Sequence, residues 1–291
     1  MISAWMIGPV GYDIYVYIDA YPKEDDGCYI NTYKKAVTAD AAIISLLLNS
    51  KYHIRLLADG LGHDADANLV RLKINSEKRQ LTEINPKNPD SSFGFVISTK
   101  NGSRTWISNI RFPKAHDLNT LIATLITKEK PDVLYLDCWK SDLYGYKFLQ
   151  NLDNLHAQLY YVNIGDSNDF SIPTMSILNN LDKVVLQISV KDSRSLKTTF
   201  QSLKLKENQY ILFTRGGDSL ITYAGNTIKE FPVRSLTGID STGAGAIFTS
   251  SVLNFLAKDM YHWPDLIDSA VMDAISHTYN RLQQHSREYY L

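Results

Sequence analysis

The spacing of apolar and polar positions changes part-way along the 291-residue chain. Beyond residue 118, short apolar runs alternate regularly with stretches of helical spacing. This alternation predicts a parallel sheet that is covered by helices on both faces. The predicted strands are 133–136, 158–162, 183–188 and 210–214, and the predicted helices are 118–128, 143–152, 174–181, 193–203, 243–257 and 264–284.

The first part of the chain interrupts this rhythm with two predicted strand pairs. Residues 13–18 alternate with a period of two, and 29–33 is a candidate return strand. Residues 93–107 form a second pair around a turn at 100–103. Both pairs fit a small second sheet, a candidate lid, inserted at about 12–35 and 88–112 of one domain spanning 1–291. The remaining early elements are strands at 4–7 and 54–58 and helices at 38–48 and 64–72, and a late hairpin is expected at 220–231.

The amino-acid composition limits which binding partners and which cellular compartment are expected. The net charge is −1, with 30 basic and 31 acidic residues, so neither nucleic acid nor an anionic membrane is expected as a partner. The longest apolar run, 41–48, is too short to span a bilayer, and the first residues lack the basic segment of a signal peptide. Cys28 and Cys138 have no metal-ligand spacing, which predicts reduced thiols in a cytoplasmic protein.

The stretch with the most evident chemistry is 238–248, GIDSTGAGAIF. Glycines and small residues there join a strand-like region to a predicted helix. A helix beginning near Gly243 would direct its unpaired N–H groups and positive dipole end at an anion. A structural strand-to-helix turn would have the same composition, so the rest of the chain decides between the two interpretations.

Five segments, in this order along the chain, resemble the ribokinase-like (PfkB) family of carbohydrate and nucleoside kinases. They cover nearly the whole chain. Their order implies a three-layer α/β/α sandwich with a mainly parallel central sheet and a small inserted β-sheet lid. The activity implied is ATP-dependent phosphoryl transfer to a sugar or nucleoside hydroxyl. The segments are GPVGYD (8–13), DGLGHD (59–64), the hairpin 93–105, TRGGDSL (214–220) and DSTGAGAIF (240–248).

The resemblance assigns roles to residues of this chain. It implies an anion hole at the start of the last glycine-rich motif, with ATP and Mg²⁺ as cofactors, K⁺ as a further cation and a homodimer formed through the lid. The sugar or nucleoside would contact Gly11, Asp13 and Asp40. The nucleotide would contact Thr214, Arg215, Gly216 and Gly217. The anion hole would be Gly243, Ala244, Gly245 and Ala246; Asp192 would lie in the outer shell of Mg²⁺, and Asp240 and Thr242 would hold the monovalent cation.

The chain departs from the family pattern at three functional points. Ala246 stands where the family has the Asp that takes the proton from the sugar hydroxyl. A methyl group cannot accept a proton, and losing a general base costs roughly 10²–10⁴ in rate. The glycine-rich sugar motif is replaced by KAVTAD (35–40), in which Asp40 replaces an Asn. The Asn-x-x-Glu motif aligns with 189–192 and keeps only the shorter carboxylate of Asp192.

Two origins of Ala246 are open, natural divergence or an engineered Asp→Ala change, and the departures at independent points favour divergence. Neither Asp240, six residues before Ala246, nor Asp13, which binds hydroxyls by resemblance, is a preferred substitute base. Two functions follow as hypotheses. One is an impaired ATP-dependent carbohydrate kinase, and the other is a catalytically inactive pseudokinase that binds a small molecule or a protein partner. The sequence does not name the substrate.

Overall fold

The computed structural model describes residues 1–138, 143, 145–165, 171–190, 204–234, 239, 241–284 and 290–291. The predicted helix 193–203 lies outside these residues. Within them, no helix is long and apolar enough to cross a membrane.

The main sheet is largely parallel, as predicted. Parallel pairing runs from β5 across to β11, and an antiparallel hairpin, β12–β13, completes one edge. The spatial order is β13-β12-β11-β10-β9-β8-β1-β4-β5. The strands are β1 (Ile2–Pro9), β4 (Tyr52–Asp59), β5 (Arg79–Glu83), β8 (Val133–Asp137), β9 (Leu159–Gly165), β10 (Val184–Ser189), β11 (Gln209–Thr214), β12 (Ser219–Ala224) and β13 (Thr227–Pro232).

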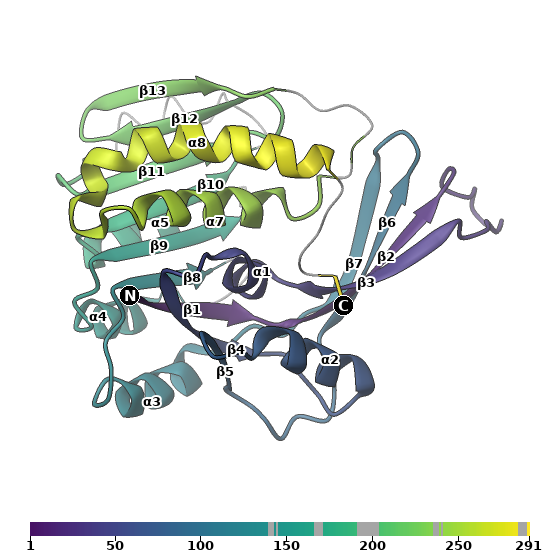
Figure 1. Cartoon of the computed structure of the whole chain (residues 1–291), viewed down its shortest axis with the longest axis horizontal. Helices are drawn as coiled ribbons and strands as arrows, with labels where there is room; N and C mark the ends of the chain where they lie inside the picture. The colour runs from purple at the N-terminus through teal and green to yellow at the C-terminus, as the bar shows by residue number, and fades with distance from the viewer. Residues whose placement is uncertain are drawn as a thin grey trace.

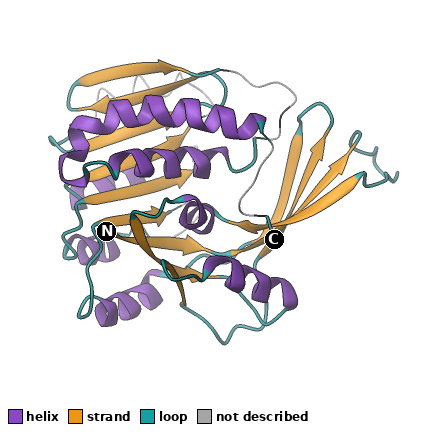
Figure 2. Cartoon of the chain, in the orientation of Figure 1, coloured by secondary structure: helices purple, strands orange, loops and turns teal. Residues whose placement is uncertain are grey.

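Helices cover both faces of this sheet, which gives three layers (Figures 1 and 2). Successive side chains of β1 point to opposite faces, so Ala4 and Met6 join one buried cluster while Trp5 and Ile7 join the other. The first cluster contains α1 (Asp40–Leu47), α2 (Ala65–Ile74), α7 (Ala244–Leu256) and α8 (Trp263–Gln283), which η1 (Met260–His262) precedes. The second contains α3 (Ala115–Leu125), α4 (Tyr146–Asp153) and α5 (Ser171–Asn180).

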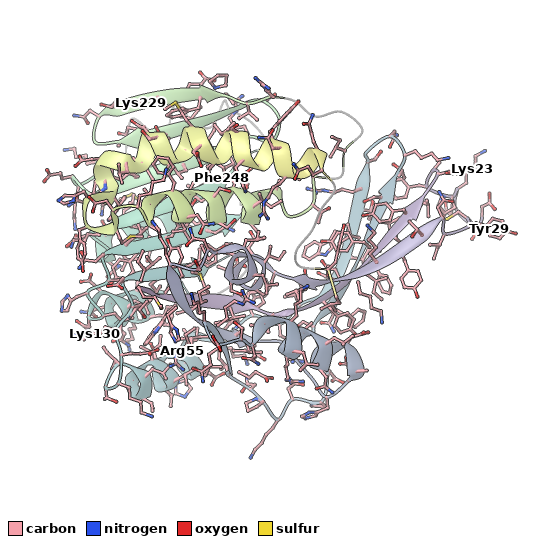
Figure 3. The ribbon with its side chains drawn as sticks, in the orientation of Figure 1. Lys23, Tyr29, Arg55, Lys130, Lys229 and Phe248 are labelled. Atoms are coloured by element: carbon pink, nitrogen blue, oxygen red, sulfur yellow. The ribbon has the colours of Figure 1, made fainter. Side chains whose placement is uncertain are left out.

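A second sheet of four strands projects from the body (Figure 1). Its order is β3-β2-β6-β7, formed by β2 (Gly11–Ile18), β3 (Thr32–Thr38), β6 (Phe93–Thr99) and β7 (Arg104–Asn109). Lys23 and Tyr29 mark its outer tip in Figure 3. The chain ends at its base, where the amide of Leu291 donates to the Lys35 carbonyl at 2.9 Å. These layers and the small sheet confirm the predicted fold class.

The structure differs from the local predictions in two places, for identifiable reasons. The return strand, predicted at 29–33, runs from Thr32 to Thr38, the residue at which the following helix was predicted to begin. Only Ala39 separates this strand from α1, and it adopts φ of 76°, a left-handed conformation that a sequence pattern does not reveal. Strand β5, with sequence RQLTE, was missed because it pairs with β4 on one side only and therefore needs no apolar run.

The topology fixes where a ligand can bind. From β1 the chain builds the sheet first towards β4 and β5, and then returns to add β8 on the opposite side. Open α/β sheets bind ligands beyond the carboxyl ends of their strands at such a switch point. The small sheet begins at that same edge, directly after Pro9, and so stands over the crevice.

A substitution at Gly11 tests how tightly the backbone packs at the junction between β1 and the small sheet. A Cβ atom there would overlap the backbone carbonyl of Ser92, which cannot move independently because it accepts from the amide of Tyr12 at 3.2 Å. We expect Gly11→Ala to lower the free energy of unfolding by about 1–3 kcal/mol in urea titrations. Gly27→Ala is the control, because no atom lies within 4 Å of its Cβ position. Equal stability of the two variants would contradict this packing.

Candidate active site

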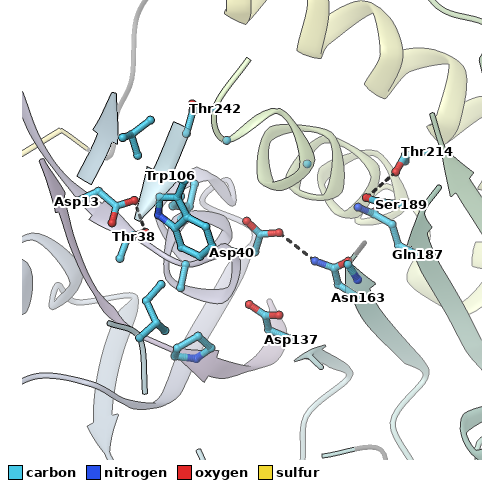
Figure 4. Close-up of a pocket in the computed structure, with 18 of the residues that line it drawn as sticks. Asp13, Thr38, Asp40, Trp106, Asp137, Asn163, Gln187, Ser189, Thr214 and Thr242 are labelled. Atoms are coloured by element: carbon cyan, nitrogen blue, oxygen red, sulfur yellow. Dashed lines mark hydrogen bonds between the residues drawn. The ribbon is translucent and has the colours of Figure 1, made fainter. Parts of the chain in front are cut away.

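Two adjoining compartments lie at the carboxyl edge of the main sheet. One has a volume of about 540 Å³ and extends beneath the small sheet. The other has a volume of about 640 Å³ and extends towards α8. Figure 4 shows the smaller compartment. The residues that line both are Asp40, Arg104, Ser189, Thr214, Gly216, Gly243 and Gly245.

A row of polar side chains crosses the floor of the smaller compartment. Asp137, Asn163 and Gln187 occupy adjacent register positions on β8, β9 and β10, and all three are buried. The sequence analysis did not identify them. Their signal was available, because each follows an apolar run near the end of a predicted parallel strand, where strand ends meet at one edge of the sheet.

Asn163 holds the carboxylate of Asp40. Its Oδ1 accepts from the Gly165 amide at 3.0 Å, which fixes the orientation of the side-chain amide. Nδ2 then donates to Asp40 Oδ2 at 3.0 Å (Figure 4). Burial of the carboxyl raises the pKa of Asp40 to about 6, and the hydrogen bond from Asn163 opposes that rise.

Gln187 is fixed in a similar way. Its Oε1 accepts from the Tyr161 hydroxyl at 2.6 Å and from Thr249 Oγ1 at 2.9 Å. With the oxygen engaged on two sides, the donor Nε2 faces the start of α7, 4.0 Å from the position that a Gly245 Cβ would occupy. The site therefore presents an N–H donor beside the beginning of that helix.

Asp13 lies on β2 at the lid side of the same compartment. Its Oδ2 accepts from Thr38 Oγ1 at 2.7 Å, whereas Oδ1 has no partner of normal hydrogen-bond geometry. Burial raises the pKa of Asp13 to about 6, and hydrogen bonding from Thr38 and from the nearby Trp106 indole opposes the rise. A buried carboxylate that lines the compartment beside these two donors suits a hydroxyl group of a ligand.

The helix α7 begins as the sequence predicts. Gly243 caps it at φ of 81°, a conformation that glycine adopts readily, and no side chain caps its first amides. The Ala244 amide donates to the Ser241 carbonyl at 3.1 Å and is thereby engaged within the turn. Gly245 lines both compartments, whereas the Ala246 side chain is fully buried in the core. Gly245 is thus the first-turn residue of α7 that borders both compartments, and Ala246 follows it in the same turn.

The lid contacts this turn directly. Arg104 on β7 donates from Nη1 to Thr242 Oγ1 at 3.0 Å. The guanidinium thus spans the gap between the small sheet and the start of α7. Thr242 was predicted to hold a monovalent cation, and its hydroxyl accepts from Arg104 here. The second residue predicted for that cation, Asp240, lies outside the described residues.

The larger compartment contains the predicted nucleotide residues Thr214, Arg215, Gly216 and Gly217. Arg215 is partly engaged, because Nη1 donates to Ser219 Oγ at 3.0 Å and the guanidinium lies near Asp218 and Glu230. The sequence analysis missed the opposite wall. That wall is mainly apolar and contains Leu220, Val233, Ile239, Phe248, Ile275 and Leu282, together with Tyr279, whose ring the Arg234 guanidinium faces at 5.5 Å.

Among the described residues that were predicted for the site, Gly11 and Ala246 are not brought into the cavity. Gly11 lines neither compartment, and its lack of a side chain is explained by the close approach of Ser92. Asp192, predicted for Mg²⁺, lies outside the described residues. Within the described part of the chain, no group of three or more His, Cys, Asp or Glu side chains is placed to hold a metal.

We compared the chain with family models, curated proteins and solved structures. No family model matches the chain, and no curated protein does. Solved structures do match. The ribokinase from Giardia lamblia superposes with a TM-score of 0.76 at 14% identity, over 99% of this chain and 95% of that one. Arabidopsis thaliana ribokinase, solved with ribose and ATP, gives 0.66 at 14% identity over 99% and 94%.

The chain has the ribokinase-like fold. The nucleoside kinase of Methanocaldococcus jannaschii, an archaeal member of the ribokinase family, is a third example, with a TM-score of 0.56 at 14% identity over 98% of this chain and 99% of that one. At such identities the likeness establishes the architecture alone. In this ribokinase-like fold the small sheet, the switch-point crevice and the start of α7 all border the compartments described above.

The raised pKa of Asp13 has a measurable consequence for stability. The unfolded chain releases this proton near pH 3.8 and the folded protein near pH 6. The stabilisation of the folded protein that comes from this raised pKa is therefore fully present below about pH 4 and is lost as the pH rises through 6. Between pH 5 and pH 7.5 the wild type should lose about 1.4 kcal/mol more unfolding free energy than Asp13→Asn. Parallel pH dependences of the two proteins in urea would show that Asp13 is not buried as described.

Proposed function

We propose that this protein transfers a phosphoryl group from ATP to a hydroxyl group of a sugar or nucleoside. One observation carries the proposal. Two adjoining compartments share a wall, and that wall contains the glycine-capped start of α7. A transferring phosphoryl group must lie between its donor and acceptor, at a place that stabilises negative charge.

The smaller compartment suits a polyhydroxylated acceptor. Asp13, Asp137 and Asn163 offer hydrogen-bonding groups at fixed positions, and the Trp106 ring lines the same space. Carboxylates accept hydrogen bonds from hydroxyl groups, and an aromatic face packs against the apolar side of a sugar or a base. Ribose in the A. thaliana ribokinase structure is the kind of ligand this chemistry fits.

The larger compartment suits the nucleotide. Its apolar wall, including Phe248 and Ile275, can receive a base, while Gly216 and Gly217 leave backbone room beside the phosphates. Mg²⁺ in this proposal would arrive on the phosphate oxygens and neutralise their charge. Asp192, predicted for the outer shell of Mg²⁺, lies outside the described residues, so we derive no step from the metal.

The groups that would stabilise the transferring phosphoryl group are electrically neutral donors. They are the Gly245 and Ala246 amides at the positive end of α7 and the oriented Nε2 of Gln187. Arg104 adds a positive charge from the lid side of the same wall. Such fixed donors supply much of the catalysis in phosphoryl transfer, where the protein contributes positioning more than covalent chemistry.

A second candidate function rests on Ala246. With a buried methyl group where the resemblance expects a proton acceptor, the cavity would bind its ligands without efficient turnover. The protein would then act as a small-molecule sensor or an interaction module. Homodimerisation through the small sheet and a cytoplasmic location belong to both candidates, supported by the exposed Tyr33 and Ile107 on that sheet and by two free cysteines.

The nucleotide compartment can be tested with a matched pair of variants on α8. Ile275 lines the compartment, whereas Met272, one turn earlier, is exposed. Ile275→Glu places a carboxylate against the bound nucleotide, and we expect ATP affinity in calorimetry to fall by about tenfold or more, equivalent to about 1.4 kcal/mol. Met272→Glu should leave the affinity within about twofold. Equal effects, or no ATP binding to the wild type, would reject this location.

The choice between the two functions needs a turnover assay. Release of ADP from MgATP would be followed with D-ribose, D-fructose or adenosine as acceptor, with mass spectrometry of the phosphorylated product. Transfer to at least one acceptor above the rate of ATP hydrolysis supports the kinase. ATP binding without transfer to any of the three favours the binding module.

A further inference from the structure

We propose that Asp40 is the proton acceptor of this site, acting from α1 in place of a base on α7. The inference rests on the proposed phosphoryl transfer and identifies the group that completes it. Its starting point is geometric, because Asp40 stands in the first turn of α1 and α1 packs directly against α7. The starts of these two helices therefore face one cavity.

The distance between the two helix starts is short. Asp40 Oδ2 lies 3.8 Å from the position that a Cβ atom on Gly245 would take. Gly245 immediately precedes Ala246, so the Asp40 carboxyl borders the amides that would receive the transferring phosphoryl group. In Figure 4 the Asp40 side chain lies beneath the start of α7, between Trp106 and Asn163.

Position relative to the compartments distinguishes Asp40 from the other carboxylates. Asp13 and Asp137 line only the smaller compartment, on the acceptor side. Asp40 lines both compartments, and in the described part of the chain it is the one carboxylate that does so. A hydroxyl proton is lost where the acceptor meets the γ-phosphate, which is at this shared wall.

The carboxyl is oriented and open for this task. Asn163 holds Oδ2, and no described residue donates a hydrogen bond to Oδ1. The titratable and charged groups around it are the Tyr135 hydroxyl on β8, Asp137, which lines the smaller compartment with it, and Arg104, which lines both compartments with it. The first turn of α7 carries no acidic residue. Burial raises the pKa of Asp40 to about 6, which suits a base working near neutral pH, where it is mostly ionised.

The transfer step balances with Asp40 as acceptor. The substrate hydroxyl oxygen forms a bond to the γ-phosphorus of ATP, while the bond from that phosphorus to the β–γ bridging oxygen breaks. The bridging oxygen keeps the electron pair and leaves on ADP. The hydroxyl proton passes to Asp40 Oδ1 and is released to water once the products leave.

The burial of Ala246 explains why the base would not also be on α7. A carboxylate at that position would lie in the core, close to Asp40, and two desolvated like charges raise each other's pKa strongly. One carboxylate on α1 suffices, and a second one buried beside it on α7 would interfere. This predicts that an acidic side chain at position 246 is tolerated better when position 40 is neutral.

The test compares wild type with Asp40→Asn and Asp40→Asn/Ala246→Asp, using MgATP with D-ribose, D-fructose and adenosine. Asn retains an oxygen that can accept from Asn163, so the fold should persist. We expect Asp40→Asn to lower kcat by about 100-fold or more. ATP affinity in calorimetry should stay within about threefold. The kcat of the wild type should rise with an apparent pKa near 6, an inflection that Asp40→Asn loses.

Asp13→Asn is the matched control, because Asp13 lines only the acceptor side. It should raise KM for the acceptor and keep the pH inflection of kcat. The double variant should stay as slow as Asp40→Asn, because the side chain at position 246 is buried in the core and lines neither compartment. If Asp40→Asn fails to fold, Asp40→Glu replaces it, with a reduced kcat and a retained inflection expected.

The outcomes separate this inference from the proposed function. Transfer by Asp40→Asn at a rate within about threefold of wild type, with an unchanged pH profile, would overturn the role of Asp40 while the kinase function stands. Transfer by the double variant but not by wild type would overturn it as well. If wild type binds no ATP and transfers nothing, the proposed function fails and the inference fails with it.

Discussion

The arrangement of the site depends on the hydrogen bond between Asn163 and Asp40, which connects the main sheet to the helix that follows the lid. It links β9 of the main sheet to the first turn of α1, which follows directly from the lid strand β3. The single residue between them, Ala39, holds a left-handed conformation that turns the chain from lid to helix. Strained backbone persists where the surroundings determine it fully, and such places cluster at functional sites.

Desolvation governs the electrostatics around that bond. Asp13 and Asp40 have carboxyl pKa values raised to about 6 by burial, and Asp137 is buried beside them. Among the described residues that line the smaller compartment, Arg104 carries the one permanent positive charge, and it points to Thr242. The cavity is thus rich in hydrogen-bond acceptors and has neutral donors at the start of α7. That arrangement favours hydroxyl-bearing ligands on one side and phosphate groups at the boundary.

The electrostatic cost of burying carboxylates also relates Asp40 to Ala246, two departures that are separate in the sequence. Asp40 in KAVTAD and Ala246 in GAGAIF lie far apart along the chain, and each departs from the family pattern. In space they belong to helices that pack together. A carboxylate on α1 with a methyl group on α7 preserves one ionisable group at the junction. The two departures are then parts of a single rearrangement.

The sequence predicted the layers, the parallel strands and the small sheet, because periodicity reports burial directly. It predicted the glycine-capped start of α7, because Gly243 occupies a conformation that few other residues adopt. It did not place Asn163 or Gln187, since register between strands far apart in the chain decides which polar residues become neighbours. It assigned Gly11 to substrate, whereas packing against Ser92 accounts for that glycine. The position of Asp40 opposite Gly245 depends on helix packing, which no local pattern encodes.

The most direct test is a crystal structure with Mg²⁺ and a non-hydrolysable ATP analogue. We expect the terminal phosphate within hydrogen-bond distance of the Gly245 and Ala246 amides, with the base in the larger compartment. Asp40 should lie on the side of the terminal phosphorus opposite the β–γ bridge, within hydrogen-bond reach of the position that the attacking hydroxyl oxygen takes in line with the departing group. A terminal phosphate bound elsewhere, or Asp40 on the same side as the leaving group, would contradict the transfer site described here.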